Sequence, residues 1–527
     1  MHKIFYLHEL VDLIVEHLAL VKPRSDSNWH RDPDTHAYDP LLLAARRDVK
    51  ALGQTSIIGL LLAVDAVEEI PRNYGSRGSI KQWRMTRHLS EIDIPLLLRY
   101  SSRIRELFLP SLPKLEVIET TEGMLSFQNV VVLFPRLRLI SSHSFNNAEL
   151  NFVMSTVSDG SLTHMVTRTA APVPPTFMAM VAKRRHRLQA LYLSFSDLDD
   201  HIVNIGRTVK ILLEEAPVLT ELHIWNDISQ HVNVFSAAAY LPQLTNLSLS
   251  DRSLSFDGPN ANFHKLTKLH FCMANMASFM SAMANVTFPN LQSFHVVLYT
   301  CDSNSHRPRD LLFSIVRVCH EAPLSSLVLR STSDRDPSSP PMETLGPNSL
   351  DILMHFPLQE LRIWMLWSWD LTDDTMERIA HEWPDMQDLR LDPAGTWPRP
   401  SNVTAYGLEV LTSSCGNLSV LGLQLNIAPT YCKWSKESDP HAHVEDSTWS
   451  EALTVLFVGH SNIDSPADVT QFLSHVFPNL KTCTPEQPVE VGDQVMYKRW
   501  SDVYEFFSSR NMARYEARQR DDNRDAK

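Results

Sequence analysis

Apolar residues in the middle of the chain return in one short pattern: Leu, two polar residues, an apolar residue, a polar residue and another apolar residue. The clearest copies begin at Leu219, Leu244, Leu266 and Leu291, so their starts lie 22 or 25 residues apart. The last three positions alternate between apolar and polar, as in a strand with one buried face. Each copy therefore predicts a short strand that turns its apolar side chains towards a core.

The segments between these strands have the pattern of helices. Before Leu219, apolar residues from Leu198 to Leu213 recur at three- and four-residue spacing, after a candidate N-cap at Asp197 or Asp199. A unit of one strand and one helix cannot bury its own apolar face, so the units are expected to stack. A fixed period of about 20–30 residues is typical of leucine-rich solenoids. An ordinary α/β domain with several similar strands is the alternative.

We therefore predict an α/β fold, a right-handed and curved leucine-rich-repeat solenoid. Weaker copies of the pattern begin at Ile104, Leu137, Leu162 and Leu188, and later ones at Leu324, Leu358, Met386, Leu418 and Leu453. The solenoid is expected over residues 100–485, with loops at 332–349 and 431–447. A linker is expected at 68–99, and a C-terminal helix with a charged tail at 486–527.

The N-terminal residues follow a different pattern. The apolar residues of the first segment recur at helical spacing on one face, at Leu7, Leu10, Val11, Ile14 and Leu18. A polar insert (22–39), a second apolar segment (41–52) and a third expected helix (57–67) follow. Burying a large aliphatic side chain stabilises by about 1.5–3 kcal/mol, so the first face must find a partner surface. Residues 1–67 are thus predicted to form a small all-α module, or a cap on the solenoid.

Two stretches resemble known modules. The N-terminal segments resemble the F-box through Leu7-His8-Glu9-Leu10, Leu13-Ile14 and Leu18, then Leu42, Leu43, Val49, Leu52 and Thr55-Ser56. His8 stands where that family prefers Pro. The stretch from Tyr406 to Leu423 resembles the cysteine-containing leucine-rich repeat of F-box substrate receptors, with Cys415 in the Cys position. Trp383 takes the same position in the preceding copy.

This resemblance implies a non-catalytic substrate-recognition subunit of a Skp–cullin–F-box (SCF) type E3 ubiquitin ligase. The Skp-type adaptor of the cullin–RING ligase would bind the apolar N-terminal residues, namely Leu7, Leu10, Val11, Ile14, Leu18, Leu42, Leu43 and Leu52. The solenoid would bind a target protein that the sequence does not identify. A leucine-rich-repeat scaffold or regulatory protein without ubiquitin-ligase association remains the alternative.

The residues beside the inward positions of each strand are expected to project from the concave face. We predict that the target binds there, at Trp225, Glu360, Arg362, Trp364, Asp388 and Arg390. Trp and Arg are the residue types that dominate protein–protein binding energy. The pattern also places Glu221, His223 and Asp392 on this face. Trp367 and Trp369, just beyond the Trp364 strand, either join the face or pack beneath the long loops.

Composition excludes several classes of function. The net charge of −13 over 527 residues is unfavourable for general nucleic-acid binding, which requires a basic surface. The six cysteines have no C-x-x-C spacing, which is typical of a reducing compartment, so a cytoplasmic or nuclear location is expected. The longest apolar run, Ile57 to Val64, is far shorter than the ~20 residues that span a bilayer. We expect no membrane segment and no cofactor.

Catalytic and metal sites are also not expected. Gly459-His460-Ser461 is similar to the start of the G-x-S-x-G nucleophile elbow, but Ile463 replaces the glycine that the tight turn needs. An enzyme that uses Ser461 is therefore a distant rival hypothesis. A set of metal-ligand residue types, Cys432, His441, His443, Glu445 and Asp446, has no spacing that fits a known metal site.

Overall fold

The computed structural model of the chain describes the residues in the ranges 67–69, 83–85, 92–101, 105–109, 132–142, 157, 160–168, 175–194, 202–225, 233–251, 260–300, 307–332, 344–365, 367–393, 397, 401–427, 450–485 and 493–525. The chain divides into two units, Met1–Leu162 and Thr163–Lys527. Apart from Val67, the predicted F-box-like module (1–67), with its eight adaptor-binding residues, lies outside the described residues.

The described residues of the first unit form two pairs of strands and a helix. Strands β1 (Val67–Glu69) and β2 (Trp83–Met85) pair antiparallel, and β3 (Glu106–Leu109) and β4 (Leu139–Ser142) pair parallel. Helix α4 (Ile94–Ser101) precedes β3. The hydroxyl of its last residue, Ser101, donates to the carbonyl of Leu133 over 2.6 Å.

The second unit is built on a long parallel sheet whose strands follow chain order. They are β5 (His164–Arg168), β6 (Ala190–Ser194), β7 (Glu221–Trp225), β8 (Asn246–Asp251), β10 (Lys268–Met273), β12 (Ser293–Leu298), β13 (Ser326–Ser331), β15 (Glu360–Trp364), β17 (Asp388–Leu391), β18 (Val420–Gly422), β20 (Val455–Gly459) and β22 (Thr482–Pro485). Every neighbouring pair is parallel. This is a mixed α/β fold, as predicted, and a solenoid is compatible with it.

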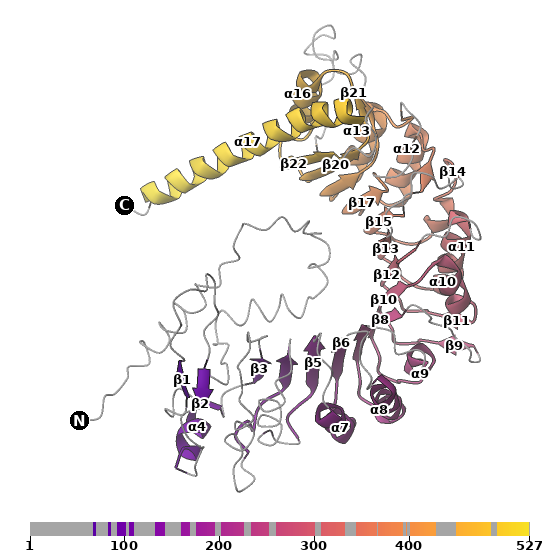
Figure 1. The fold of residues 1–527 in the computed structure, drawn as a ribbon. Coiled ribbons are helices and arrows are strands. Elements are labelled where there is room, and N and C mark those ends of the chain that lie inside the picture. Colours follow the sequence, from indigo (N-terminus) through magenta and orange to yellow (C-terminus); the bar gives the residue numbers. More distant parts are fainter. Residues whose placement is uncertain are drawn as a thin grey trace. The chain divides into compact units, whose positions relative to one another are not determined.

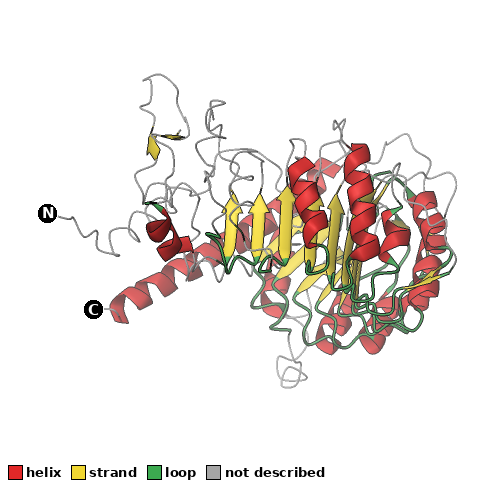
Figure 2. Ribbon diagram, turned by 90° about the horizontal axis from the view of Figure 1, so that it is seen from below, coloured by secondary structure: helices red, strands yellow, loops and turns green. Residues whose placement is uncertain are grey.

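Helices connect most of these strands on one side of the sheet. They are α7 (Pro175–Arg184), α8 (Ile202–Glu215), α9 (Val234–Ala238), α10 (Met276–Met283), α11 (Pro308–Cys319), the 3-10 helix η1 (Asp351–Leu353), α12 (Asp373–Glu382), α13 (Ala405–Ser414) and α16 (Pro466–Val476). Within this unit the sheet curves, with the helices on its outer side and the strands on its inner side (Figures 1 and 2). The inner face of the sheet is therefore concave and free of these helices.

The apolar pattern of the sequence accounts for the core between sheet and helices. The apolar second residue of each strand pairs in register with its counterparts, from Leu222 through Leu247, Leu269 and Phe294 to Leu327. These side chains are at most 2 % exposed. Minor parallel pairs lie outside the main sheet: β9 (Ala261–Asn262) with β11 (Val286–Thr287), β14 (Thr344–Leu345) with β16 (Ser368–Trp369), and β19 (Asn426–Ile427) with β21 (Asn462–Ile463). Strand β14 lies inside the predicted loop 332–349, so the end of that segment is ordered rather than a loop.

A ladder of hydrogen bonds joins each repeat to the next just before the strand. The N–H of Thr245 donates to the carbonyl of Thr220, and that of Thr267 to Thr245, over 2.8 and 2.9 Å. The hydroxyls of both threonines donate to the same carbonyls over 3.1 Å. Equivalent backbone bonds continue from Gln189 to Lys481. A Thr or Ser at the position after the first Leu adds a second bond to the same carbonyl, but Gln and Lys keep the backbone bond there.

The cysteine position of the late repeats lies at the C-terminal ends of two successive helices. Cys415 and Trp383 are the C-caps of α13 and α12, and both are buried. The Trp383 indole donates to the carbonyl of Phe356 over 3.0 Å, and the Cys415 thiol lies 3.4 Å from the carbonyl of Trp383. These side chains fill the space between successive helix ends.

A 33-residue helix, α17 (Asp493–Asp525), packs against the last strand β22 and against α16. The Trp500 indole, which is fully buried, donates to the carbonyl of Ser461 over 2.8 Å. The Arg499 guanidinium donates to the carbonyl of Ile463 over 2.6 Å. Helix α17 thus covers the C-terminal end of the sheet (Figure 1).

Candidate functional site

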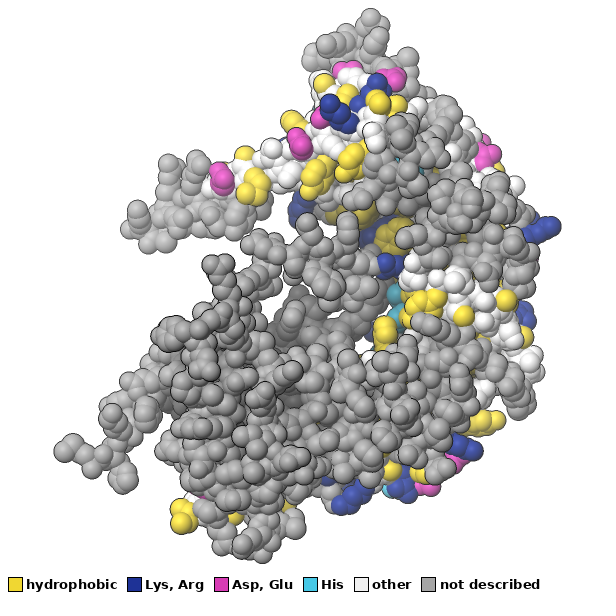
Figure 3. All heavy atoms as spheres, viewed as in Figure 1, with side chains coloured by type: hydrophobic (Ala, Val, Ile, Leu, Met, Phe, Trp, Pro, Cys, Tyr) yellow, Lys and Arg dark blue, Asp and Glu magenta, His cyan; other side chains and the backbone are white. Residues whose placement is uncertain are grey.

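The inner face of the long sheet is formed by the first, third and fifth residues of its strands. Strand β7 is typical, because Leu222 and Ile224 are buried whereas Glu221, His223 and Trp225 are not. The strand register aligns the third residues in one row: Tyr192, His223, Ser248, His270, His295, Val328, Arg362, Arg390, Gly422 and Phe457. Figure 3 shows basic, hydrophobic and histidine side chains following one another along the inner edge of this unit.

Ring side chains dominate the inner face from β6 to β12. We call this part of the face the ring sector, and its rings are Tyr192, His223, Trp225, His270 and His295. Tyr192 and His223 stack with their ring centres 3.9 Å apart, and His270 and His295 stack at 4.2 Å. The Trp225 ring meets His270 edge-on at 5.5 Å. Ser248, between the two stacks, places its hydroxyl 3.2 Å from Nδ1 of His270. Flat rings of this kind offer broad contact area with little side-chain freedom to lose.

His270 and His295, which stack on each other, are uncharged at neutral pH. Burial lowers the pKa of His270 to about 4. Burial also lowers the pKa of His295 well below its ordinary value, and the nearby His270, Arg330 and Arg362 lower it further. Burial raises the pKa of the Cys272 thiol, 3.5 Å from Nε2 of His270, to about 12. Cys272 is therefore a protonated thiol with little nucleophilic character.

Charged side chains form the inner face at β15 and β17. We call this part the arginine sector, and it consists of Glu360, Arg362, Trp364, Asp388 and Arg390. Arg362 pairs with Glu360 over 2.7 Å and with Asp388 over 2.8 Å. Arg390 makes two hydrogen bonds to Asp388, of 2.8 and 2.9 Å. The Ser326 hydroxyl also donates to Glu360, over 2.6 Å. The charges of two arginines and two carboxylates are thus satisfied within the network.

Aromatic rings enclose the guanidinium of Arg390. It lies 5.0 Å from the ring centre of Trp364 and 4.8 Å from that of Phe457, within the range of cation–π attraction. Gly422 lies between Arg390 and Phe457 in the register, and a Cβ there would approach the Arg390 side chain to 3.2 Å. Burial raises the pKa of Asp388, whereas hydrogen bonding and charge from Arg390, together with the charge of Arg362, oppose that shift.

The structure divides the predicted target-binding residues between the two sectors. Glu360, Arg362, Trp364, Asp388 and Arg390 lie together in the arginine sector, and Trp225 lies five strands away in the ring sector. Trp225 is 40 % exposed, whereas the side chains of Arg362 and Arg390 are only 17 and 9 % exposed. The two arginines are thus mainly internal partners of the face, and Trp225 is its accessible ring.

The placement of Asp392 on the inner face is wrong. Its backbone takes a left-handed conformation, with φ of 47°, which turns the side chain inwards, and the residue is fully buried. Its carboxylate accepts hydrogen bonds from the backbone N–H groups of Met365 and Trp367 over 3.2 and 2.6 Å. Trp367 and Trp369 are also fully buried, so they pack in the interior rather than join the face.

The sequence pattern placed Trp225, His223, Trp364 and Asp388 on the inner face. It did not predict the contact of Arg390 with Phe457 or the ring contacts of His223, His270 and His295. All three occupy the polar position between the two apolar residues of the strand, in nearby copies of one pattern. Equivalent positions of adjacent repeats become neighbours once the register is known, so this coincidence is the signal for the His270–His295 stack, whereas Ser248 separates His223 from His270. Gly422 and Phe457 carry no comparable local signal.

Ser461 is held as a structural residue. It is 1 % exposed, its hydroxyl accepts a hydrogen bond from the N–H of Leu425 over 2.7 Å and donates to the carbonyl of Val458. The described residues contain no group of three or more His, Cys, Asp or Glu side chains placed to hold a metal ion. The candidate ligands from Cys432 to Asp446 lie outside the described residues.

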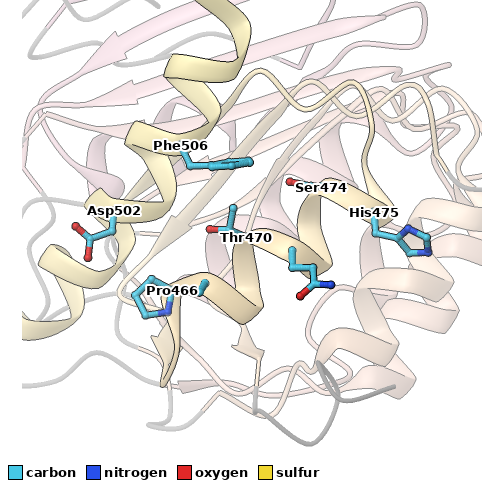
Figure 4. Close-up of a pocket in the computed structure, with 8 residues that line it drawn as sticks. Pro466, Thr470, Ser474, His475, Asp502 and Phe506 are labelled. Carbon is cyan, nitrogen blue, oxygen red and sulfur yellow. The ribbon is translucent and has the colours of Figure 1, made fainter. Parts of the chain in front are cut away.

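A groove of about 780 Å³ lies between α16 and α17. Figure 4 shows side chains of α16, among them Thr470 and His475, on one side and Asp502 and Phe506 of α17 on the other. Its lining is mixed and it holds no convergent set of polar groups.

No helix in the described part of the chain is both long and apolar enough to cross a membrane.

The fold and its inner face define a mixed α/β protein built on a repetitive parallel sheet. No protein family model and no curated protein matches the chain. Among solved structures, it is similar to a chain of the structure described as the Rad7 and Elc1 complex in yeast. The identity is 13 % and the TM-score 0.37, over 67 % of this chain and 77 % of that chain. A likeness this distant carries no conclusion about function.

Proposed function

We propose that the protein is an F-box/leucine-rich-repeat protein that acts as the substrate-recognition subunit of an SCF-type ubiquitin ligase. In this proposal residues 100–485 form a right-handed, curved leucine-rich-repeat solenoid. The observation that carries it is the agreement between the L-x-x-L-x-L pattern and the strands, which lie in parallel and in register from β5 to β22. Repeats of this kind present one extended face to a partner.

The N-terminal residues provide the link to the ligase in this proposal. Leu7, Leu10, Val11, Ile14 and Leu18 would pack on a Skp-type adaptor, which joins the chain to a cullin–RING ligase. The support comes from the resemblance of residues 7–56 to the F-box, in combination with repeats that resemble those of F-box substrate receptors. Such a receptor works in the cytoplasm or nucleus and leaves ubiquitin transfer to other subunits.

The inner face would bind the target protein. Its ring sector and arginine sector combine Trp, Arg and Tyr side chains, which carry most of the binding energy in protein interfaces. The arginine sector is preorganised, because its ion pairs are already formed. Preorganised side chains lose little freedom on binding, which favours affinity.

The proposal is tested by capture of a Skp-type adaptor and a cullin with the full-length protein. We expect Leu10→Asp and Ile14→Asp to abolish capture, because each puts a charge on a face that must lose its water. The far-ultraviolet circular dichroism should stay nearly unchanged. Glu16→Lys, which reverses a charge on the opposite face of the helix, is the control and should still capture the adaptor.

Two outcomes contradict the proposal. If the wild-type protein captures no adaptor, the chain is a repeat scaffold or regulator without ligase association. If Leu10→Asp unfolds the whole protein, the first helix is a cap of the solenoid rather than a docking element.

A further inference from the structure

The ring sector carries an accessible strip on β6 and β7 that the ion pairs of the arginine sector do not reach. The strip consists of Tyr192, Glu221, His223 and Trp225. Tyr192 and Glu221 are joined, since the phenol donates a hydrogen bond to the carboxylate. His223 stacks on Tyr192, and Trp225 is 40 % exposed at the end of the strand.

We infer that this strip binds an extended, basic segment of the target protein, with one Arg or Lys side chain over Trp225 and another at Glu221. The inference rests on the proposed function, in which the inner face holds the target. It adds the chemical class of the segment that the face recognises.

The exposed indole is the first reason. Trp is the aromatic side chain that attracts cations most strongly, and its attraction grows as water is excluded. The contact with His270 is edge-on, at an interplanar angle of 67°, so it occupies only part of the ring surface. Because burial keeps His270 uncharged at neutral pH, this neighbour does not repel a cation.

The carboxylate of Glu221 is the second reason. Glu221 and Trp225 lie at the two ends of β7, four residues apart, which is about 13 Å along a strand. Two side chains four residues apart in an extended partner span the same distance. A guanidinium at Glu221 would also lie beside the Tyr192–His223 stack, which adds ring surface to the ion pair.

The distribution of charge is the third reason. In the register, Trp225 aligns on one side with Ser250, Cys272 and Val297 before Arg330, four strands or about 19 Å away. On the other side it aligns with Ser194 and then Arg168, two strands or about 10 Å away. Lys268 is two strands from Glu221, also about 10 Å. All three separations exceed the screening length of about 8 Å at physiological salt. The chain as a whole carries a net charge of −13, which attracts a basic partner.

The test uses the full-length protein and four fluorescein-labelled peptides of eleven residues in a Gly/Ser background. They carry two Arg, two Lys, two Glu or two Leu residues four positions apart. Binding is followed by fluorescence anisotropy at about 150 mM NaCl. We expect the Arg peptide to bind most tightly and the Lys peptide next. Trp225→Ala should weaken Arg-peptide binding about fivefold or more, and Glu221→Gln by about threefold.

Tyr240→Ala is the matched control, because Tyr240 is 75 % exposed but lies outside the strip; it should leave binding unchanged. Tighter binding of the Glu or Leu peptide, an equal loss in Tyr240→Ala and Trp225→Ala, or no binding of any peptide at 1 mM would each overturn the inference. Adaptor capture is measured separately on the same variants. Failure of adaptor capture contradicts the ligase proposal alone, whereas failure of peptide selectivity contradicts only the basic segment.

Discussion

At the scale of single residues, backbone conformation decides where the pattern of the sequence fails. The L-x-L alternation assumes extended backbone, and Asp392 leaves it by turning to a positive φ, so its carboxylate serves buried N–H groups instead of the inner face. Side-chain direction in such a turn depends on distant partners such as Trp367. The sequence pattern around Asp392 therefore could not show that its side chain turns inwards.

Gly459 gives the sharpest prediction at this scale. Its φ is +54°, and a Cβ would lie 1.8 Å from the carbonyl oxygen of Pro393. Gly459→Ala combines a left-handed non-glycine residue with a backbone clash, so it should lower the free energy of unfolding by about 2–5 kcal/mol. Gly416→Ala, where a Cβ would meet nothing within 4 Å, should change it by less than about 0.5 kcal/mol. Urea denaturation of both variants measures the difference, and equal stabilities would contradict the clash.

At the scale of elements, strands were predictable and side-chain networks between them were not. Apolar residues such as Leu222 and Leu247 are buried and alternate with polar ones, and this local alternation predicts the strands. The stack of His270 on His295 depends on register between β10 and β12, and the enclosure of Arg390 depends on Gly422 and Phe457. Such contacts join residues far apart in the chain, so they need the whole sheet.

The stack of His270 on His295 predicts a loss of stability in acid. His270 is neutral in the folded protein until its pKa of about 4, whereas it takes up a proton near pH 6.5 when unfolded. Between these values the unfolded state binds more protons, so the free energy of unfolding falls as pH falls, by at most about 1.4 kcal/mol per pH unit for this histidine. Urea denaturation from pH 7.0 to 4.5 should show a shallower decline for His270→Gln than for wild type.

A matched variant separates the stack from other titrating groups. The side chain of His381 is 85 % exposed, so His381→Gln should follow the wild-type pH profile. Asp388 acts in the opposite direction, because burial raises its pKa and the folded state then binds its proton more readily. That contribution is common to all three proteins and cancels in the comparison. A His270→Gln profile parallel to wild type would show that the stack does not resist protonation.

At the scale of the second unit, a stacked array has ends that need cover. Helix α17 covers β22, and the buried Trp500 fixes it through the bond to Ser461. Trp500→Ala should cost about 3–5 kcal/mol locally. Since each repeat contacts mainly its neighbours, hydrogen exchange should accelerate in β20 and β22 before it does in β7 or β8. Val495→Ala, at a 57 % exposed position of the same helix, should leave exchange unchanged. Uniform acceleration over the sheet would contradict a local cap.

The ladder of backbone N–H donors before the strands makes the joint between repeats the same along the sheet. The distance along the chain from one joint to the next varies from 22 to 35 residues, yet the backbone bonds stay at 2.8–2.9 Å. Differences in length are therefore accommodated away from the joint, in the segments between one strand and the next. A gene that codes for such a chain can gain or lose a whole repeat, because the N–H donor of each remaining repeat meets the equivalent carbonyl of its new neighbour. The number of copies, and with it the breadth of the inner face, can thus change over evolution without a new way of folding.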